Sequence, residues 1–285
     1  YNITLLFFLL TFGIMAQETS ISGEIKDAKN NSILDYVNIG ISNKNTGTIS
    51  DAKGNFNLKL NDKVTPGDTV VFSHIGFETK KLLVNQLKST NNKIILEPSE
   101  NTLKEVVVQF KKPKSKQFGR SSKGLALMHS NFFYAMDKTI DDRLSREKGM
   151  QFKIKKDCKV NDFNFNITAN DFKSVKFRLN FYKVENDLPS KIIVEKDILF
   201  EVKDGFRGIY TLDLKPYDIY LYKEMGEIAV TIQWIESVKK DDKSKFFAIS
   251  TAVAPTETSF YRERNMSTWY KSGQSLTFYL NTMCQ

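Results

Sequence analysis

The chain has 285 residues, a formal net charge of +9 and 41% hydrophobic residues. This length predicts about two domains, and the hydrophobic share is enough for each to bury a core. A mean hydropathy of −0.36 excludes a membrane protein with many spanning helices, and the 22 Phe and 11 Tyr favour strands over helices.

An apolar run at residues 3–16 is followed at once by polar residues. A membrane-spanning helix needs about 20 apolar residues, so this run is too short and fits the apolar core of a secretory signal peptide. We therefore expect residues 1–17 to be a signal peptide that lacks its beginning. The mature protein is then exported, to the periplasm, the outer membrane or the cell surface. An uncleaved anchor or a buried strand is the alternative interpretation.

Residues 20–98 form a series of short expected strands separated by polar turns. Residues 55–60 alternate apolar and polar side chains, as a half-buried strand does. The turn Pro66-Gly67-Asp68 precedes a β-branched and aromatic run at residues 69–73. Six or seven strands at this spacing predict a β-sandwich of two sheets.

Several turn and strand motifs in this segment carry a family resemblance: Ile21-Ser22-Gly23, Asn45-Thr46-Gly47-Thr48, Asp51 with Gly54 and Phe56, residues 67–73, and Ile75-Gly76-Phe77-Glu78-Thr79. With them, the segment resembles the carboxypeptidase-regulatory-like domain of exported Bacteroidetes proteins. The resemblance implies a transthyretin-like, or Ig-like, sandwich. The sequence departs from the family at Leu34-Asp35-Tyr36, where a Pro-containing turn is usual, and at His74, where an aromatic such as Tyr is usual.

The family name raises the question of a peptidase site. A zinc carboxypeptidase needs closely spaced His and Glu ligands and a further His. The chain has only His74 and His129, and they lie far apart in the sequence. We therefore expect no metal, no other cofactor and no catalysis in this module.

Residues 99–124 are rich in Lys, Ser and Gly and are predicted to be a linker. Their order resembles the junction that follows the same domain in TonB-dependent receptors, although we expect neither a plug nor a barrel in residues 125–285. The basic residues are predicted either to be solvated or to contact an anionic surface: Lys111, Lys112, Lys114, Lys116 and Arg120. Export makes nucleic acid an unexpected partner.

The second domain is predicted to span residues 125–285 and to begin with a short helical or irregular segment. Met128, Phe132, Phe133 and Met136 have the spacing of an amphipathic helical turn, and the charged residues 137–148 are expected to form a loop or surface helix without a site. From Met150 onward, eight or nine alternating segments predict a second antiparallel sandwich of jelly-roll character. The fold class is therefore mostly β. This half also resembles an uncharacterised partner domain of the same exported proteins.

Candidate site residues are few. Cys158 lies near the start of the second domain and Cys284 near its end. An exported protein allows them to form a disulfide, which would close a long loop and stabilise the fold by up to roughly 4 kcal/mol. Whether they pair is open. Trp269 and Tyr270 lie in a polar setting and are the candidate surface-binding aromatics. His129-Ser130 has no acidic partner nearby in the sequence, so no catalytic residue is assigned.

Two functions remain. The preferred one is a non-catalytic envelope protein that binds a protein or glycan, or acts as a scaffold, through its sandwiches near the outer membrane. The alternative is an envelope hydrolase with its site in the C-terminal domain. A deep pocket with a perturbed titratable group would favour the enzyme, and a shallow aromatic face would favour the binding module.

Overall fold

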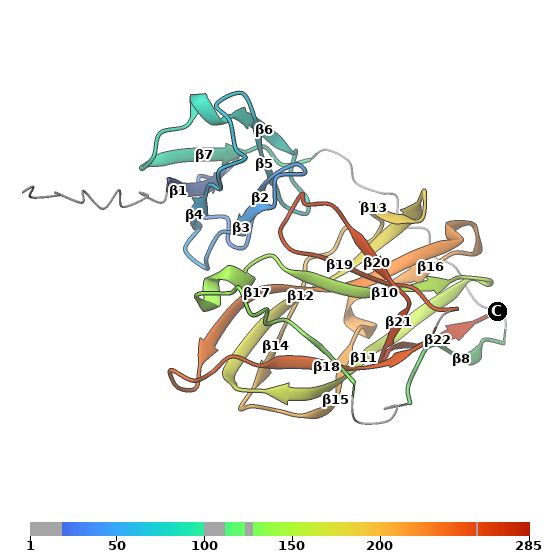
Figure 1. Cartoon of the computed structure of the whole chain (residues 1–285). Coiled ribbons are helices and arrows are strands. Elements are labelled where there is room, and N and C mark those ends of the chain that lie inside the picture. Colours follow the sequence, from blue (N-terminus) through green and yellow to red (C-terminus); the bar gives the residue numbers. More distant parts are fainter. Residues whose placement is uncertain (1–18, 100–111, 123–127, 255) are drawn as a thin grey trace, which may run out of the picture.

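The computed structural model describes residues 19–99, 112–122, 128–254 and 256–285, and it is built almost entirely of strands (Figure 1). This confirms the predicted mostly-β class with antiparallel sheets. The only helical segments in these ranges are short 3-10 turns: η1 (Val84–Gln86), η2 (Ile140–Arg143), η3 (Lys215–Tyr217) and η4 (Lys223–Met225). None of them is long or apolar enough to cross a membrane. The expected signal peptide and Lys111 lie outside the described residues.

The N-terminal domain is a small sandwich of two sheets. One sheet has the strand order β4 (Asn55–Lys59), β1 (Ser20–Asp27), β7 (Asn92–Leu96). The other has the order β3 (Thr46–Ile49), β2 (Asn38–Ile41), β5 (Thr69–Ser73), β6 (Lys80–Leu83). All pairs are antiparallel except β1 with β7.

Alternation along β4 fills the core of this domain as the sequence predicts. Phe56 and Leu58 are buried, whereas Asn55, Asn57 and Lys59 are exposed. Side chains of a strand point alternately to its two faces, so one face of β4 packs inward. The Phe56 ring meets Phe72 of the facing sheet edge-on, with 5.6 Å between ring centroids.

The C-terminal domain is a larger sandwich. Its seven-stranded sheet follows the order β13 (Leu188–Ile192), β12 (Phe172–Glu185), β17 (Glu227–Lys239), β10 (Glu147–Lys153), β19 (Ser259–Arg262), β20 (Tyr270–Ser272), with β14 (Ile198–Lys203) also on β12. Its eight-stranded sheet follows the order β21 (Gln274–Leu276), β18 (Phe247–Val253), β11 (Cys158–Asn170), β22 (Phe278–Cys284), β8 (Lys114–Gly119); β15 (Gly208–Asp213) and β16 (Tyr220–Leu221) pair with β11, and β9 (His129–Asn131) with β18.

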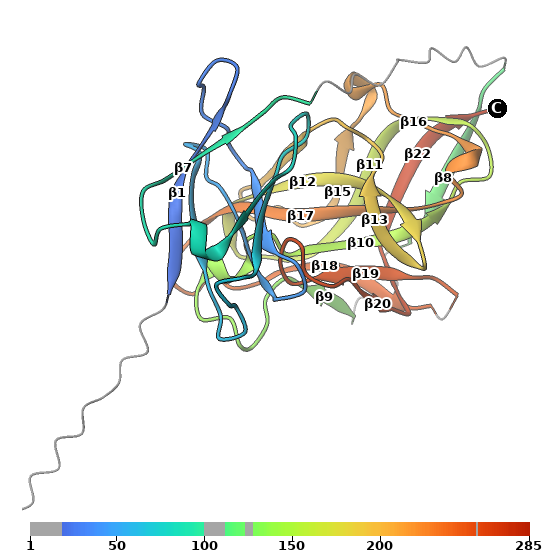
Figure 2. The ribbon, with the colours of Figure 1, turned by 90° about the horizontal axis from the view of Figure 1, so that it is seen from above.

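Figure 2 shows β12, β17 and β10 of the seven-stranded sheet side by side. Aromatic rings fill the space between the two sheets. Trp234 is fully buried, as its phase with neighbouring core residues predicts, and meets the rings of Phe132, Phe172, Phe177 and Phe247 at centroid distances of 5.3–5.8 Å. Such rings bury large apolar areas and prefer tilted or edge-on contacts. The hydrophobic core of the C-terminal domain is therefore large enough to accommodate a polar pocket at its edge.

Part of the predicted linker is structured. Residues 114–119 form β8, which pairs with β22 from Lys114↔Cys284 to Gly119↔Tyr279, and Phe118 is only 7% exposed. The linker prediction is wrong for these residues. The basic composition hid the strand because an edge strand needs only backbone pairing and one inward apolar side chain to be held in place.

The entry to the second domain takes the irregular form of the two that the sequence allows, and not the amphipathic helical turn. Phe132 is fully buried while Met136, four residues later, is 89% exposed, so the two do not share a helix face. Residues 137–148 likewise form neither a loop nor a surface helix throughout: they contain the turn η2 and the first residues of β10, and Arg143, Arg146, Glu147 and Lys148 are buried.

The loop between β19 and β20 reaches the N-terminal domain (Figure 1). Asn265 of this loop joins the two domains. Asn265 is 1% exposed. Its Nδ2 donates to the Asn38 side-chain oxygen at 2.8 Å and to the Thr48 carbonyl at 3.1 Å, both in the N-terminal domain. Its Oδ1 accepts a hydrogen bond from Gln233 Nε2 at 2.6 Å in the C-terminal domain. One side chain thus bridges both domains.

Glycines allow this close approach. Gly40 of β2 and Gly47 of β3 are paired across the sheet, and an added Cβ would lie 2.5 Å and 2.9 Å, respectively, from the Asn265 carbonyl oxygen. Glycine in a strand often marks a place where another backbone comes near. Only residues without a side chain fit here.

A second contact joins the domains on β12. Arg178 Nη2 donates to the Tyr36 carbonyl at 2.9 Å, and Asp197 holds the same guanidinium at 2.5 Å. Arg178 is 1% exposed and the side chain of Asp197 is 26% exposed, so the guanidinium is shielded from solvent and the carboxylate only partly. Buried charge-assisted hydrogen bonds are geometrically specific, and they fix the orientation of one domain on the other.

A disulfide connects Cys158, at the start of β11, with Cys284, at the end of β22. The Cα atoms are 4.0 Å apart across the two paired strands, and the residues are separated by 126 positions. The structure therefore brings the two cysteines together and ties the first long strand of the second domain to the last.

Removal of this disulfide is expected to destabilise the C-terminal domain. In the chain-entropy model, closing a loop of this length contributes about 5 kcal/mol. Urea unfolding of the Cys158→Ser/Cys284→Ser double variant, followed by near-UV circular dichroism, measures the effect. An unchanged unfolding midpoint would show that the bond does not form in the folded protein.

Candidate functional site

The side chain of Lys148 carries an ammonium group on the inner face of the larger sandwich. The residue precedes Met150 and Phe152 at spacings of two along β10, and both of those residues belong to the hydrophobic core. Residues two apart in a strand share a face, so the chain places a cation where an apolar side chain is expected. Lys148 is only 7% exposed.

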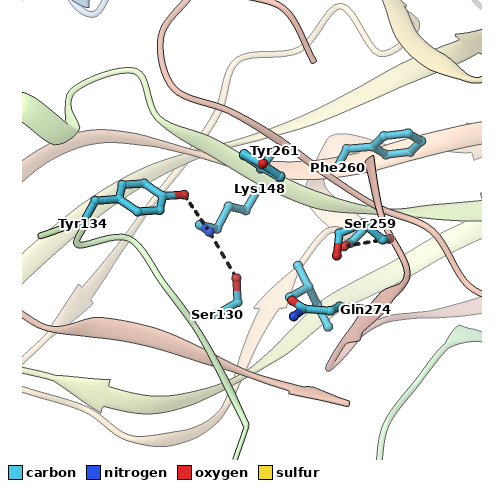
Figure 3. A pocket seen from close by; sticks show the side chains of 9 residues that line it. Ser130, Tyr134, Lys148, Ser259, Phe260, Tyr261 and Gln274 are labelled. Atoms are coloured by element: carbon cyan, nitrogen blue, oxygen red, sulfur yellow. Dashed lines mark hydrogen bonds between the residues drawn. The ribbon is translucent and has the colours of Figure 1, made fainter. Parts of the chain in front are cut away.

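A pocket of about 210 Å³ lies beside Lys148, at an edge where strands from the two sheets meet (Figure 3). Its lining comes from both sheets and is mostly polar: Ser130, Tyr134, Lys148, Ser259, Phe260, Tyr261, Ser272, Gln274 and Leu276. Figure 3 shows the Lys148 ammonium between the hydroxyls of Tyr134 and Ser130. The bonds are 3.3 Å to Tyr134 and 3.2 Å to Ser130.

No carboxylate among the described residues forms an ion pair with Lys148. The acid whose charge acts on Lys148 is Glu263, which accepts a 2.9 Å hydrogen bond from Arg146 Nε. Burial disfavours the charged form and lowers the pKa of Lys148 to about 8, although the negative charge of Glu263 acts to raise it. Burial likewise raises the pKa of the Tyr134 hydroxyl.

The neighbouring residue Glu147 shows what a satisfied buried charge looks like in this sheet. Glu147 points to the opposite face of β10 and is fully buried. Arg262 binds its Oε2 at 2.6 and 2.8 Å, and Asn180 donates to its Oε1 at 2.9 Å. Because a buried ion is costly without a counter-ion, the contrast identifies Lys148 as the buried charge of this strand that lacks one.

The two predicted surface aromatics have different environments. Trp269 is half-buried, packed edge-on against Tyr182 with the Arg262 guanidinium 4.5 Å from its ring, so it covers the Glu147 ion pair. Tyr270 is 44% exposed and stacks on Tyr261 with 5.1 Å between centroids. Since Tyr261 lines the pocket, Tyr270 lies next to its aromatic wall.

The two histidines are not brought together. His74 lies at the domain interface, 3.8 Å from Asp197, and burial with the nearby Arg178 lowers its pKa. His129 is exposed and contacts Thr168 Oγ1 at 2.9 Å. Within the described ranges no three His, Cys, Asp or Glu side chains form a group that could hold a metal ion.

The described part of the basic run is divided between two roles. Lys112 and Lys114 are exposed. Lys116 lies 4.7 Å from the ring centre of Phe118, and Arg120 binds the Ser275 carbonyl at 2.6 Å and Ser275 Oγ at 3.0 Å. Arg120 therefore joins strands and is engaged within the fold.

Sequence reasoning missed Ser130, Tyr134 and Lys148 as a group. Ser130 was considered only with His129, but neighbouring residues of a strand point in opposite directions. Phe152 and Ile154 alternate with lysines. Counting back from Phe152 in steps of two residues reaches Met150 and then Lys148, which places Lys148 on the core face. That signal was present in the sequence. Its hydroxyl partners, about 15 residues away, were not readable from spacing.

Replacement of Lys148 by Met is expected to stabilise the fold. A pKa lowered from 10.5 to about 8 corresponds to an unfavourable contribution of about 3 kcal/mol below pH 8. The unfolded state binds the extra proton between pH 8 and 10.5, so wild-type stability rises through this window relative to Lys148→Met. Urea unfolding at pH 7 and pH 10 tests this. A less stable variant at pH 7 would contradict the assignment of an uncompensated charge.

The N-terminal domain has recognisable relatives. The family model of the CarboxypepD_reg-like domain matches residues 21–108. The chain is 33% identical over 106 residues to TonB-dependent receptor P3 of Formosa agariphila, and 31% identical over 99 residues to TonB-dependent receptor SusC of Bacteroides thetaiotaomicron. These matches cover 36% and 35% of this chain but only 10% and 9% of the receptors, so the chain spans about a tenth of the length of either relative.

A likeness of the whole chain to solved structures is weak. The cysteine protease and lectin-like domains of Cwp84 from Clostridium difficile align over 94% of this chain and 59% of that one, with 8% identity and a TM-score of 0.38. This value is too low to support any conclusion about the second domain. The family resemblance predicted for the N-terminal segment is confirmed: the CarboxypepD_reg-like family model matches residues 21–108, and the chain is similar in part to TonB-dependent receptors.

Proposed function

We propose that this protein is a non-catalytic exported protein of the cell envelope, which binds or scaffolds a partner near the outer membrane through its two sandwiches. The matched family is a regulatory-like domain and the curated relatives are receptors, which supports a binding role. The partner is an envelope protein or a glycan. The exposed Lys112 and Lys114 are available to an anionic surface.

The observation that carries this proposal is the docking of the two domains at Asn265. The side chain is buried and bonds to Asn38, Thr48 and Gln233 at once. A contact of this kind, beside two glycines, holds the sandwiches as one unit. A partner that touches both domains then meets a preformed surface, which lowers the entropy lost on binding.

A variant that separates the domains tests the proposal. In Gly40→Ala the new Cβ would lie 2.5 Å from the Asn265 carbonyl oxygen, so the Asn265 contact cannot form as it stands and we expect the domains to move apart. Capture of envelope partners from an outer-membrane extract is expected to fall by roughly tenfold or more, because two joined binding surfaces become independent. Small-angle scattering of the same sample should show the expansion.

Gly67→Ala is the matched control, since a Cβ at Gly67 would meet nothing within 4 Å. It should keep wild-type capture and wild-type scattering. Equal capture by Gly40→Ala, with the domains shown to be apart, would place binding in a single domain. Failure of the wild-type chain to retain any envelope component would contradict the proposal as a whole.

The distance between Ser130 and Lys148 favours a second candidate function, that of a hydrolase. Ser130 Oγ lies 3.2 Å from Lys148 Nζ, and a lysine with a lowered pKa can act as a base. In a hydrolase, neutral Lys148 would take the hydroxyl proton as Ser130 Oγ adds to an ester carbonyl. The expulsion of the alcohol would then leave an acyl-serine for water to cleave.

A fluorophosphonate probe separates the two functions, because it forms a covalent bond with an activated serine. For a binding protein we expect no labelling of the full chain at pH 8.5, measured by intact mass. Labelling that disappears in Ser130→Ala and in Lys148→Met would establish the hydrolase instead.

A further inference from the structure

We propose that the pocket around Lys148 binds a small ligand that carries one carboxylate and several hydroxyl groups, such as a single uronic acid unit. This inference deepens the proposed binding role by assigning a ligand class to one site on the C-terminal sandwich. It does not depend on the docking of the two domains.

The charge of Lys148 defines what the pocket lacks. Ser130 and Tyr134 accept two hydrogen bonds at 3.2 and 3.3 Å, which are long for this kind of bond. An ammonium has three donors, so one remains for a ligand. No carboxylate of the described residues lies within ion-pair distance, and the side chain is 7% exposed. An anion in the pocket would supply the missing counter-charge.

A monoanion fits better than a dianion. Lysine offers a compact point charge, whereas the planar fork of arginine matches phosphate or paired oxygens. The neighbouring Arg146 is already neutralised by Asp137, at 2.6 and 2.9 Å, and by Glu263. The pocket has one free positive charge, on Lys148, and the Glu263 carboxylate already acts on it. This combination disfavours a ligand with two negative charges. A carboxylate carries one negative charge and can accept a hydrogen bond from the remaining ammonium N–H.

The other lining groups suit hydroxyls. Ser130, Ser272 and Gln274 are partly buried and line the pocket together. Hydroxyl and amide groups both donate and accept hydrogen bonds, so they match an alcohol in either role. A purely apolar acid would displace water from these groups without replacing its hydrogen bonds, which is unfavourable.

Aromatic rings and size limit the ligand further. Tyr261 lines the pocket and is stacked on the exposed Tyr270, so the rim presents a rigid ring pair. Such rings offer an apolar face with a polar end, against which the C–H face of a sugar can pack. The volume of about 210 Å³ is below the roughly 300–1,000 Å³ of pockets for drug-sized ligands. The site therefore has room for one small unit.

Isothermal titration of the full chain at pH 7 tests the inference with D-glucuronate, D-glucose and inorganic phosphate as probes. We expect glucuronate to bind at least tenfold more tightly than either of the other two. Lys148→Met should lose at least about thirtyfold in affinity, as expected when one partner of a buried charge pair is truncated. Because the variant is expected to fold more stably than wild type, lost binding cannot be explained by unfolding.

Lys153→Met is the matched control in the same strand. Lys153 is exposed, lies on the opposite face of β10 and pairs loosely with Glu227 at 3.5 Å. It should bind glucuronate as wild type does. Undetectable glucuronate binding, equal binding of phosphate or glucose, or wild-type affinity in Lys148→Met would each overturn the inference.

The pH dependence gives an independent readout. Affinity should fall by roughly tenfold for each pH unit above about 8, because the free protein loses the ammonium proton there. The charged or titratable groups that face Lys148 are Tyr134, Tyr261, Arg146 and Glu263. Arg146 and Tyr134 have raised pKa values and keep their protonation over this range.

The two proposals fail separately. Loss of glucuronate binding with intact partner capture would reject only the pocket assignment. Intact glucuronate binding without any captured partner would reject the scaffolding role and leave the pocket as the site of function.

Discussion

The amide of Asn265 is the contact on which the shape of this protein depends. It uses both ends of one side chain, donating to Asn38 and Thr48 of the small sandwich while accepting from Gln233 of the large one. The buried Arg178 adds an ion pair with the partly exposed Asp197 and a bond to the Tyr36 carbonyl. Because Asn265 and Arg178 are buried, breaking the interface would leave several polar atoms without partners. The domains therefore act as one body.

β10 connects this architecture to the proposed chemistry. Its neighbouring residues Glu147 and Lys148 point to opposite faces of the seven-stranded sheet, and both are buried. On one face Arg262 neutralises the carboxylate. On the other face the ammonium contacts two hydroxyls and three aromatic rings, has no carboxylate partner among the described residues, and borders a pocket. A charge that costs stability in the free protein is suited to a ligand that supplies the opposite charge.

The strands were predictable and the contacts between distant segments were not. Period-two alternation identified β4, and the phase of Trp234 identified a core residue. The same rule, extended backward from Phe152, would have placed Lys148 inward. In contrast, β8 was hidden by its lysines, since an edge strand is held by backbone pairing that composition does not report. The role of Asn265 depends on partners more than 200 residues away, such as Asn38 and Thr48, and no local pattern encodes it.

The glycine pair at the interface has a consequence for how this sequence can vary. Gly40 and Gly47 present backbone rather than side chains to Asn265, so the small domain is recognised largely through its main chain at that point. The loops and outward-facing side chains of the small domain can then change without altering the fit, provided that these two positions stay bare. A module built in this way can diversify its outer surface over evolutionary time while remaining joined to the same neighbour.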